Sequence, residues 1–320
     1  MKTILDLVAF LEQYYLNGYI RGGGSKLKLF TSRDGNKVTE VLKSVCARAR
    51  EKGYSVTYAD VAAIPRLHGI HHIYQALVRE VELDTLVKEY CLQLIKRLGY
   101  EEYNMEDDED LVTWATSRFG RVPEILRREI RGQLEQDLFR NLSFNRSFST
   151  AILHLSSWLL GARENTLSCE DADILYSWLR GEDVALKDLR RFHIFTKVDR
   201  YNARSMLRSL AEFTCLANRP GLVLALDKLE VLAAKQPGGR PMYNKSARNE
   251  FYESLRQLID GLETLSHVLI IIGFQRELVD DEIRGLRSYE ALWLRIQHEI
   301  ESSKPNLFRD FIDLDVLKPV

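Results

Sequence analysis

The chain reads Lys26-Leu27-Lys28-Leu29-Phe30-Thr31-Ser32-Arg33-Asp34-Gly35-Asn36-Lys37-Val38 where a strand pattern passes through a short polar loop into a helix pattern. Polar and apolar side chains alternate over residues 26–30, as they do in a strand. From Val38 onward the apolar residues recur at helical spacing until Gly53, a residue type that commonly ends helices. Residues 54–58 again have the pattern of a strand. This part of the chain therefore predicts a parallel pair of strands joined by a helix.

The polar loop lies where nucleotide-binding proteins of this strand–loop–helix type carry a phosphate-binding loop, or P-loop. That loop has the pattern G-x-x-x-x-G-K-[ST]: its glycines let backbone N–H groups close around phosphates, its lysine reaches the β and γ phosphates, and its hydroxyl residue binds magnesium. Here Thr31 and Asn36 replace the two glycines. Lys37 keeps the lysine, and Val38 replaces the hydroxyl residue. Only one of the four motif positions is kept, and it is the place of the loop between a strand and a helix that makes it a candidate for a degenerate P-loop.

Other residues of the loop argue against tight ATP binding. Asn36 places a side chain where the backbone must approach phosphate, although asparagine tolerates left-handed backbone angles, and Gly35 is the remaining glycine. Asp34 adds a negative charge beside the expected phosphate. Thr39 comes one residue too late to replace the missing hydroxyl, and we expect it to point elsewhere on the helix unless the loop register shifts.

A continuous apolar run at residues 221–226 ends in Asp227-Lys228-Leu229-Glu230. Active ATPases of this type place an aspartate and then a glutamate after such a strand, one serving magnesium and the other polarising water. Asp227 fits the first role, with Glu230 as a further carboxylate. Lys228 stands in the place of the glutamate and, when charged, cannot accept a proton from water. Hydrolysis is therefore expected to be absent or very slow. Taken alone, the segment also fits an ordinary buried strand followed by a charged turn.

The chain as a whole predicts an α/β fold of the P-loop NTPase class, with a parallel sheet flanked by helices. Residues 1–65 contain an N-terminal helix and the first part of this core. Residues 209–320 contain the rest of the core, including an apolar strand at 268–272, and the C-terminal helices. Residues 66–208 have helical periodicity almost throughout and are expected to form a large helical insertion.

Composition narrows the class of protein. Of the 320 residues, 45% are apolar and 28% charged, as in globular chains, and 45 Lys and Arg nearly balance 46 Asp and Glu. Residues 1–16 have the pattern of an amphipathic helix without the features of a signal peptide, and no apolar run approaches the roughly 18 residues of a membrane span. We therefore expect a cytoplasmic protein that does not bind membranes. The widely spaced cysteines are expected to be free thiols: Cys46, Cys91, Cys169 and Cys215.

Two charged segments and one histidine cluster are further candidate sites. The basic residues Lys235, Arg240, Lys245 and Arg248, with Tyr243, suit phosphate contacts on DNA, and a solvated loop is the alternative. Residues 101–110 hold seven acidic residues, which fit a solvated loop or a docking site for a basic partner. The histidines have no cysteine or carboxylate at the spacing of metal sites, so no metal is expected at His68, His71 and His72.

Several segments of this sequence, taken in order, resemble the ATP-binding proteins of BREX phage-defence islands, a P-loop family related to the AAA and STAND ATPases. The resemblance covers most of the chain and rests on residues 18–30, 50–54, 178–182 (Trp-Leu-Arg-Gly-Glu), 202–207 and 285–295. The departures from the family pattern fall on the ATP site: the P-loop glycines, the hydroxyl after Lys37 and the glutamate replaced by Lys228. This distribution indicates a divergent, non-hydrolysing member.

The resemblance implies roles for two more residues. Gln275 takes the position of the polar residue that senses the γ phosphate in related ATPases. Arg295 takes the position of the arginine that touches a phosphate at a subunit boundary, and a surface or salt-bridged arginine is the alternative. Relatives of the AAA type often form rings, so the analogy also implies a homo-oligomer.

Three functions follow from these observations. The favoured one is a pseudo-ATPase, not an enzyme, that acts as a scaffold or regulatory subunit of a multi-protein phage-defence assembly. It would need no cofactor, and any ATP it bound would depend little on magnesium. The second is an active ATPase motor or switch that uses Lys37, Asp227 and Glu230, with a neighbour supplying the missing groups. The third is a DNA-binding adaptor that works without nucleotide, through the helical insertion and the basic segment.

Overall fold

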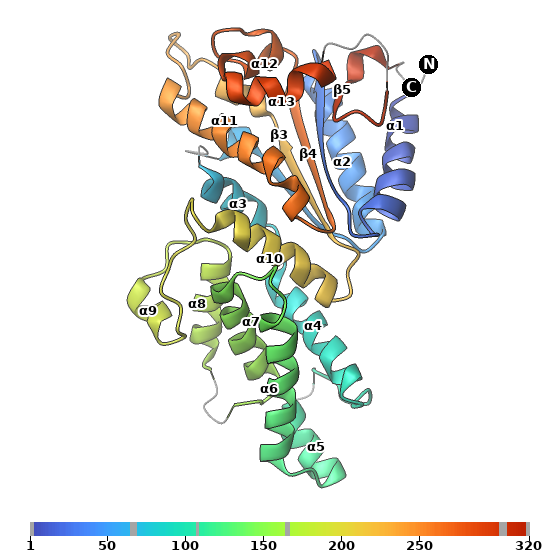
Figure 1. Cartoon of the computed structure of the whole chain (residues 1–320), viewed down its shortest axis with the longest axis vertical. Coiled ribbons are helices and arrows are strands. Elements are labelled where there is room, and N and C mark those ends of the chain that lie inside the picture. Colours follow the sequence, from blue (N-terminus) through green and yellow to red (C-terminus); the bar gives the residue numbers. More distant parts are fainter. Residues whose placement is uncertain (1–2, 65–68, 107–108, 164–166, 301–305, 318–320) are drawn as a thin grey trace. The chain divides into compact units, whose positions relative to one another are not determined.

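The computed structural model describes residues 3–64, 69–106, 109–163, 167–300 and 306–317. The chain divides into two compact units (Figure 1). One comprises Met1–Val81 with Pro220–Val320 and is called the core unit below; the other, Glu82–Arg219, is called the helical unit. The helical unit begins and ends later in the sequence than the predicted insertion, 66–208. The first helix of that insertion, α3 (Ile70–Val78), packs on strand β2 and therefore belongs to the core unit.

The core unit contains one parallel sheet in the order β2-β3-β4-β1-β5. This confirms the predicted α/β class with a parallel sheet. The predicted pairing of the first two strands is wrong: they run parallel, but β3 and β4 lie between them. Strands β3 and β4 are almost continuously apolar and buried on both faces, as the central positions of a parallel sheet require. The strands are β1 (Ser25–Ser32), β2 (Ser55–Asp60), β3 (Leu222–Asp227), β4 (Val268–Gln275) and β5 (Phe311–Asp313).

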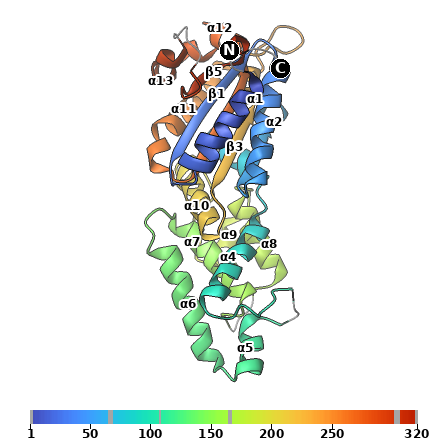
Figure 2. The same cartoon turned by 90° about the vertical axis from the view of Figure 1, so that its right-hand side faces the viewer.

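Helices cover both faces of this sheet. The first face packs against α1 (Ile4–Phe10), the π-type helix η1 (Leu11–Tyr19) and α2 (Gly35–Glu51), whose apolar residues form one buried cluster with Phe30, Val223 and Ile271. Figures 1 and 2 show α11 (Lys245–Asp260) and α13 (Glu290–Ile300) on the opposite side of the sheet from α1 and α2. The remaining elements of the unit are short: η2 (Val61–Ala63), η3 (Leu229–Leu232), η4 (Leu262–Thr264), α12 (Glu277–Asp280), η5 (Leu286–Ser288) and η6 (Leu314–Val316).

The helical unit contains only helices among its described secondary-structure elements, which confirms the prediction of a large helical insertion. Helix α5 ends at Gly120, which adopts the left-handed conformation, and α6 begins at Pro123 in the first helical position. Buried residues of α6 recur at a spacing of four, as in Leu126, Ile130 and Leu134. The helices are α4 (Leu83–Arg97), α5 (Leu111–Phe119), α6 (Pro123–Phe139), α7 (Arg146–Leu159), α8 (Cys169–Leu179), α9 (Leu186–Arg190) and α10 (Ala203–Leu216).

Within the described residues, no helix is both long enough and apolar enough to cross a membrane.

Candidate functional site

The connection between β1 and α2 is too short to form a phosphate-cradling loop. Strand β1 continues through Ser32, and only Arg33 and Asp34 separate it from the first residue of α2. Thr31, predicted to stand at the first loop glycine, is a buried strand residue paired with β4 and β5. Asp34 caps α2 by accepting a hydrogen bond from the backbone N–H of Asn36 at 3.0 Å. A P-loop needs successive backbone N–H groups turned toward a phosphate, and here the chain enters the helix at once.

A carboxylate of the protein itself lies at this end of β1. The side chain of Asp315, in η6, accepts hydrogen bonds from the Ser32 hydroxyl at 2.6 Å and from the Arg33 backbone N–H at 2.9 Å. The ammonium group of Lys37 is 3.9 Å from the same carboxylate. Partial burial acts to raise the pKa of Asp315, but the hydrogen bonds from Ser32 and Arg33 and the charge of Lys37 outweigh it and hold that pKa below its usual value. Asp315 is therefore a stable anion.

Lys37 lies in the first turn of α2, and its ammonium group is also directed at the C-terminal segment. It donates a hydrogen bond to the carbonyl oxygen of Leu314 at 2.6 Å. A second cation holds the same segment, because Arg276 donates to Asp313 at the end of β5. The lysine that a P-loop would present to the β and γ phosphates is thus bound to the backbone oxygen of Leu314 and lies beside the carboxylate of Asp315.

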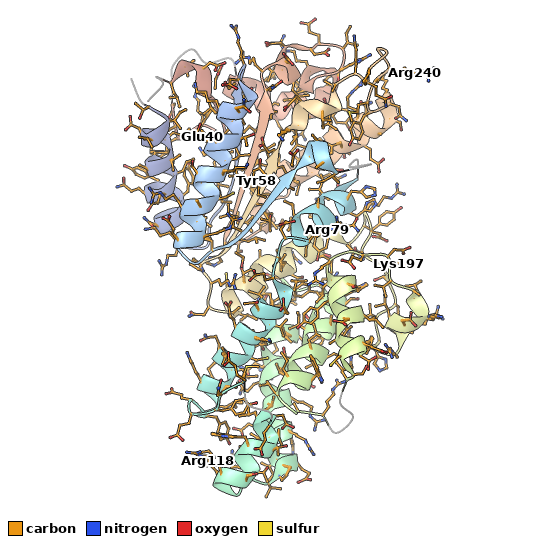
Figure 3. All side chains as sticks on the ribbon, turned by 180° about the vertical axis from the view of Figure 1, so that it is seen from behind. Glu40, Tyr58, Arg79, Arg118, Lys197 and Arg240 are labelled. Carbon is orange, nitrogen blue, oxygen red and sulfur yellow. The ribbon has the colours of Figure 1, made fainter. Side chains whose placement is uncertain are left out.

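Asp227 is buried at the end of β3 and accepts three hydrogen bonds. Its donors are the Thr39 hydroxyl at 2.6 Å, the Tyr58 hydroxyl and the backbone N–H of Lys228 at 2.9 Å. Burial and the hydrogen bond to Asp227 both raise the pKa of Tyr58, so the phenol keeps its proton and remains the donor. Figure 3 labels Tyr58 on β2. These contacts tie α2, β2 and β3 together at one carboxylate.

The exception allowed for Thr39, a shift of the loop register, applies, because the connection between β1 and α2 has only two residues. Thr39 is the residue whose hydroxyl meets Asp227, whereas Val38 is buried against the sheet. A Cβ atom at Gly273 of β4 would lie only 2.6 Å from the Val38 side chain. The two-residue connection sets this rotation of the helix, because α2 begins directly after Asp34.

Lys228 occupies the position predicted for the catalytic glutamate and pairs with a different carboxylate. Its backbone is in the left-handed region, at φ 63°, and its ammonium group forms an ion pair with Asp60 at the end of β2. The hydrogen bond that Lys228 donates to Asp60 is the main cause of a raised pKa for Lys228, so the amine stays protonated. Glu230 accepts a hydrogen bond from the backbone N–H of Gln275 at 3.1 Å, and burial raises its pKa.

The family resemblance implies phosphate-contacting roles for Gln275 and Arg295, and in the structure both side chains contact other parts of the protein. Gln275 ends β4, and its side chain covers the start of α2, where a Cβ at Gly35 would lie 2.5 Å from the Gln275 amide nitrogen. Arg295 belongs to α13 and is held in an ion pair, with its Nε atom 2.9 Å from Asp260 of α11. It also donates to the carbonyl oxygen of Ala291 at 2.9 Å. This is the salt-bridged arrangement considered as the alternative for Arg295.

The basic segment divides into exposed and buried parts. Lys235 and Pro241 form an antiparallel bridge, and Arg240, just before Pro241, is exposed (Figure 3). Lys245 is exposed at the start of α11. Arg248 is only 5% exposed, so its prediction as a surface contact to DNA is wrong. It lies one helical turn after Lys245, on the face of α11 that points inward.

The remaining candidates are the histidine cluster, the acidic segment and the cysteines. His68 and residues 107–108 of the acidic segment lie outside the described residues. The rings of His71 and His72 are in tilted contact, with ring centres 3.9 Å apart. No group of His, Cys, Asp and Glu side chains among the described residues could hold a metal ion. All four cysteines are free.

The structure thus brings together most of the predicted nucleotide-site residues and adds partners that the sequence did not indicate. The added residues are Tyr58, Asp60, Asp313 and Asp315. The strand β5 before Asp315 is only three residues long, too short for a periodic pattern. The sequence feature that could have pointed to Asp315 is the pair of carboxylates in Phe311-Ile312-Asp313-Leu314-Asp315.

One comparison with known proteins gave a match. A family model described as "BREX system ATP-binding protein BrxC/D" matches residues 18–319. Neither the curated proteins nor the solved structures gave a significant match.

Proposed function

The chain belongs to the family of BREX system ATP-binding proteins, and we propose that it is a pseudo-ATPase, a scaffold or regulatory subunit of a BREX-like phage-defence assembly. Proteins of this family belong to a multi-protein defence system. The proposal concerns what this particular chain does in it. Its ATPase fold would serve to hold partners in place instead of turning over nucleotide.

The observation that carries the proposal is the anion at the end of β1. The Asp315 carboxylate is bound by Ser32, by the Arg33 N–H and by the charge of Lys37, which are the kinds of group that otherwise bind phosphate. A second anion in this place would meet both a steric obstacle and a like charge. ATP phosphates would therefore have to displace the C-terminal segment before Lys37 could reach them.

The residues expected to support hydrolysis are also engaged with each other. Lys228 pairs with Asp60, and it cannot polarise water as a base while it carries a proton. Asp227 is saturated by Thr39, Tyr58 and a backbone N–H, so its oxygens already have partners that a hydrated magnesium ion would have to replace. Both arrangements favour a structural use of these side chains.

An active ATPase is the second candidate, and one contact favours it. In a working site the hydroxyl residue of the helix and the aspartate of the neighbouring strand share one magnesium ion. Thr39 and Asp227 are 2.6 Å apart here, which retains that neighbourhood. On this alternative, Lys37, Asp227 and Glu230 act after the C-terminal segment moves, with groups from a neighbouring subunit completing the site.

Calorimetry of ATP binding, with and without magnesium, distinguishes the two candidates. The pseudo-ATPase is expected to show no binding at millimolar ATP, or weak binding that magnesium does not strengthen. A matched experiment on Lys37→Ala gives the control, because removal of the amine should change nothing if ATP does not reach it. Magnesium-dependent binding that Lys37→Ala abolishes would contradict the pseudo-ATPase proposal and support the active one.

The assembly role has its own test. A scaffold should form stable complexes with other components of the defence system, and by analogy with AAA relatives it could also assemble with copies of itself. Light scattering after gel filtration measures the mass of the purified protein alone. Co-purification with defence components from cells, repeated without nucleotide, is expected to succeed equally well in both conditions. A complex that forms only with ATP would argue against a nucleotide-independent scaffold.

A further inference from the structure

The helical unit presents two aromatic rings to solvent on one irregular segment, residues 191–202, between α9 and α10. Phe195 is 63% exposed and Tyr201 is 79% exposed. Large aromatic side chains dominate cores and binding surfaces because they remove much apolar area from water, so two exposed rings in one short segment call for an explanation.

The backbone of this segment is firmly held. Phe192 and Ile194 are buried, and the indole N–H of Trp178 donates to the carbonyl oxygen of Thr196 at 2.9 Å. Asn202 donates to the carbonyl oxygen of Lys197 at 2.8 Å. Phe195 is therefore displayed by an anchored chain whose neighbours point inward. Because this segment is already ordered, it loses less conformational entropy when a partner binds.

The stretch of sequence that contains the two rings has a net positive charge. Between Leu186 and Arg204 the chain has six cations and two carboxylates: Lys187, Arg190, Arg191, Lys197, Arg200 and Arg204 against Asp188 and Asp199. The Arg200 guanidinium lies 4.8 Å from the centre of the Tyr201 ring. Arg191 and Lys197 have carboxylate partners, whereas Arg190 and Arg204 are exposed and form no ion pair with any described residue. Figure 3 labels Lys197 in this segment.

We propose that residues 186–204, with Phe195 and Tyr201 as stacking platforms and Arg190, Arg200 and Arg204 as phosphate contacts, bind single-stranded nucleic acid. Exposed aromatic rings interleaved with arginines fit a strand whose unpaired bases can stack and whose phosphates follow the chain. In a duplex the base faces are already stacked on one another, so they are not available to stack on Phe195 and Tyr201. An acidic protein partner would use the cations but would gain less from two separated rings.

A second aromatic site in the same unit provides a matched control. Phe119, at the end of α5, is 52% exposed and also has arginines beside it in sequence. There the charges are neutralised, because Arg118 pairs with Glu102 and Arg121 pairs with Glu129. Figure 3 labels Arg118 on this helix. An exposed ring beside paired arginines has no net attraction for phosphate.

The test is fluorescence anisotropy of the full-length protein with a labelled 20-nucleotide oligo(dT), at several salt concentrations and without nucleotide triphosphate. Wild type is expected to bind, and to bind more weakly as salt rises. Phe195→Ala and Tyr201→Ala should each weaken binding about tenfold. Arg190→Gln with Arg204→Gln should reduce the slope of log affinity against log salt by about 1.4, the value for two single-strand phosphate contacts. Phe119→Ala should leave affinity and slope unchanged.

Three results would overturn the proposal. They are the absence of binding by wild type, equal affinity for a blunt duplex of the same length, and an equal loss in Phe195→Ala and Phe119→Ala. Melting temperatures of all variants accompany the assay. Phe195, Tyr201, Arg190 and Arg204 are exposed, so these variants should melt at the wild-type temperature. A loss of binding at an unchanged melting temperature is then not caused by unfolding.

Discussion

At the scale of single residues, Asp315 is the side chain whose position most affects what the site can do. It brings a negative charge to the end of β1 and receives a hydroxyl, a backbone N–H and a nearby ammonium group. Hydrogen bonds to a charged group stabilise a fold more than those between neutral groups. The same contacts join the last described turn of the chain to α2.

We expect Asp315→Ala to lower the free energy of unfolding by about 1–3 kcal/mol, because it leaves charged and polar donors without their anion. Inorganic phosphate should restore part of that stability in the variant, since a free oxyanion can take the place of the carboxylate. Melting temperatures in phosphate and in chloride at equal ionic strength measure the effect. Asp310→Ala is the control, because Asp310 pairs with Lys26 in the same segment. Equal phosphate effects on both variants would contradict this account of Asp315.

His154 is a second residue with a specific expectation. It is buried in α7 of the helical unit, and Arg163 lies 2.9 Å from its Nδ1 atom. Burial, and then the positive charge of Arg163, lower the pKa of His154 from 6.5 to about 4. The unfolded chain therefore binds a proton at a pH where the folded chain does not. Stability should be fully present above pH 6.5 and should fall as pH drops toward 4.

Urea unfolding of wild type and His154→Gln between pH 7 and pH 4.5 measures this dependence. The variant will be less stable at neutral pH if the imidazole packs well, but its stability should fall less over the same range. A variant that loses stability with the same slope as wild type would show that other groups cause the acid sensitivity.

At the scale of elements, the close approach of α2 to β4 fixes which helix residues face the sheet. Gly273 of β4 leaves room for the Val38 and Leu42 side chains, and a Cβ there would lie 2.6 Å and 2.9 Å from them. With Val38 against the sheet, Thr39 lies beside Asp227. Gly273 thus permits the close packing of α2 that follows from its start directly after Asp34.

A pair of glycine substitutions tests this packing. Gly273→Ala should destabilise the protein by about 1–3 kcal/mol, because the core cannot accept the added methyl group without a shift. Gly132→Ala should stabilise it by about 1 kcal/mol, since this exposed position in α6 has open space around it. Urea denaturation followed by circular dichroism compares the two. Equal tolerance of both substitutions would contradict the close contact between β4 and α2.

The elements also show which parts of the fold and of the site can be predicted from the sequence. The apolar runs at 221–226 and 268–272 predicted two buried strands, because long uninterrupted apolar segments have few alternatives in a globular chain. The order of strands was not predictable from periodicity, since pairing depends on contacts between residues distant in the chain. Asp227 and Lys37 were found from their places after a strand and before a helix. Their partners Tyr58, Asp60 and Asp315 were not, because a hydrogen bond across a sheet leaves no local pattern.

At the scale of the whole molecule, the chain combines a P-loop-type core unit with a helical unit. The core unit keeps the parallel sheet of its family, and the polar residues at one edge of that sheet hydrogen-bond to one another. The helical unit carries the aromatic and basic segment proposed to bind single-stranded nucleic acid. A scaffold that holds partners through one unit and nucleic acid through the other needs no turnover.

The most direct test of the central claim is a phosphate-release assay on the purified full-length protein with ATP and magnesium, repeated with Lys37→Ala. The bound Asp315 carboxylate, the engaged Lys37 and the protonated Lys228 predict a rate equal to that of ATP without protein, and the same rate for the variant. Steady release of phosphate that Lys37→Ala abolishes would contradict the account and show that the C-terminal segment leaves the site during turnover.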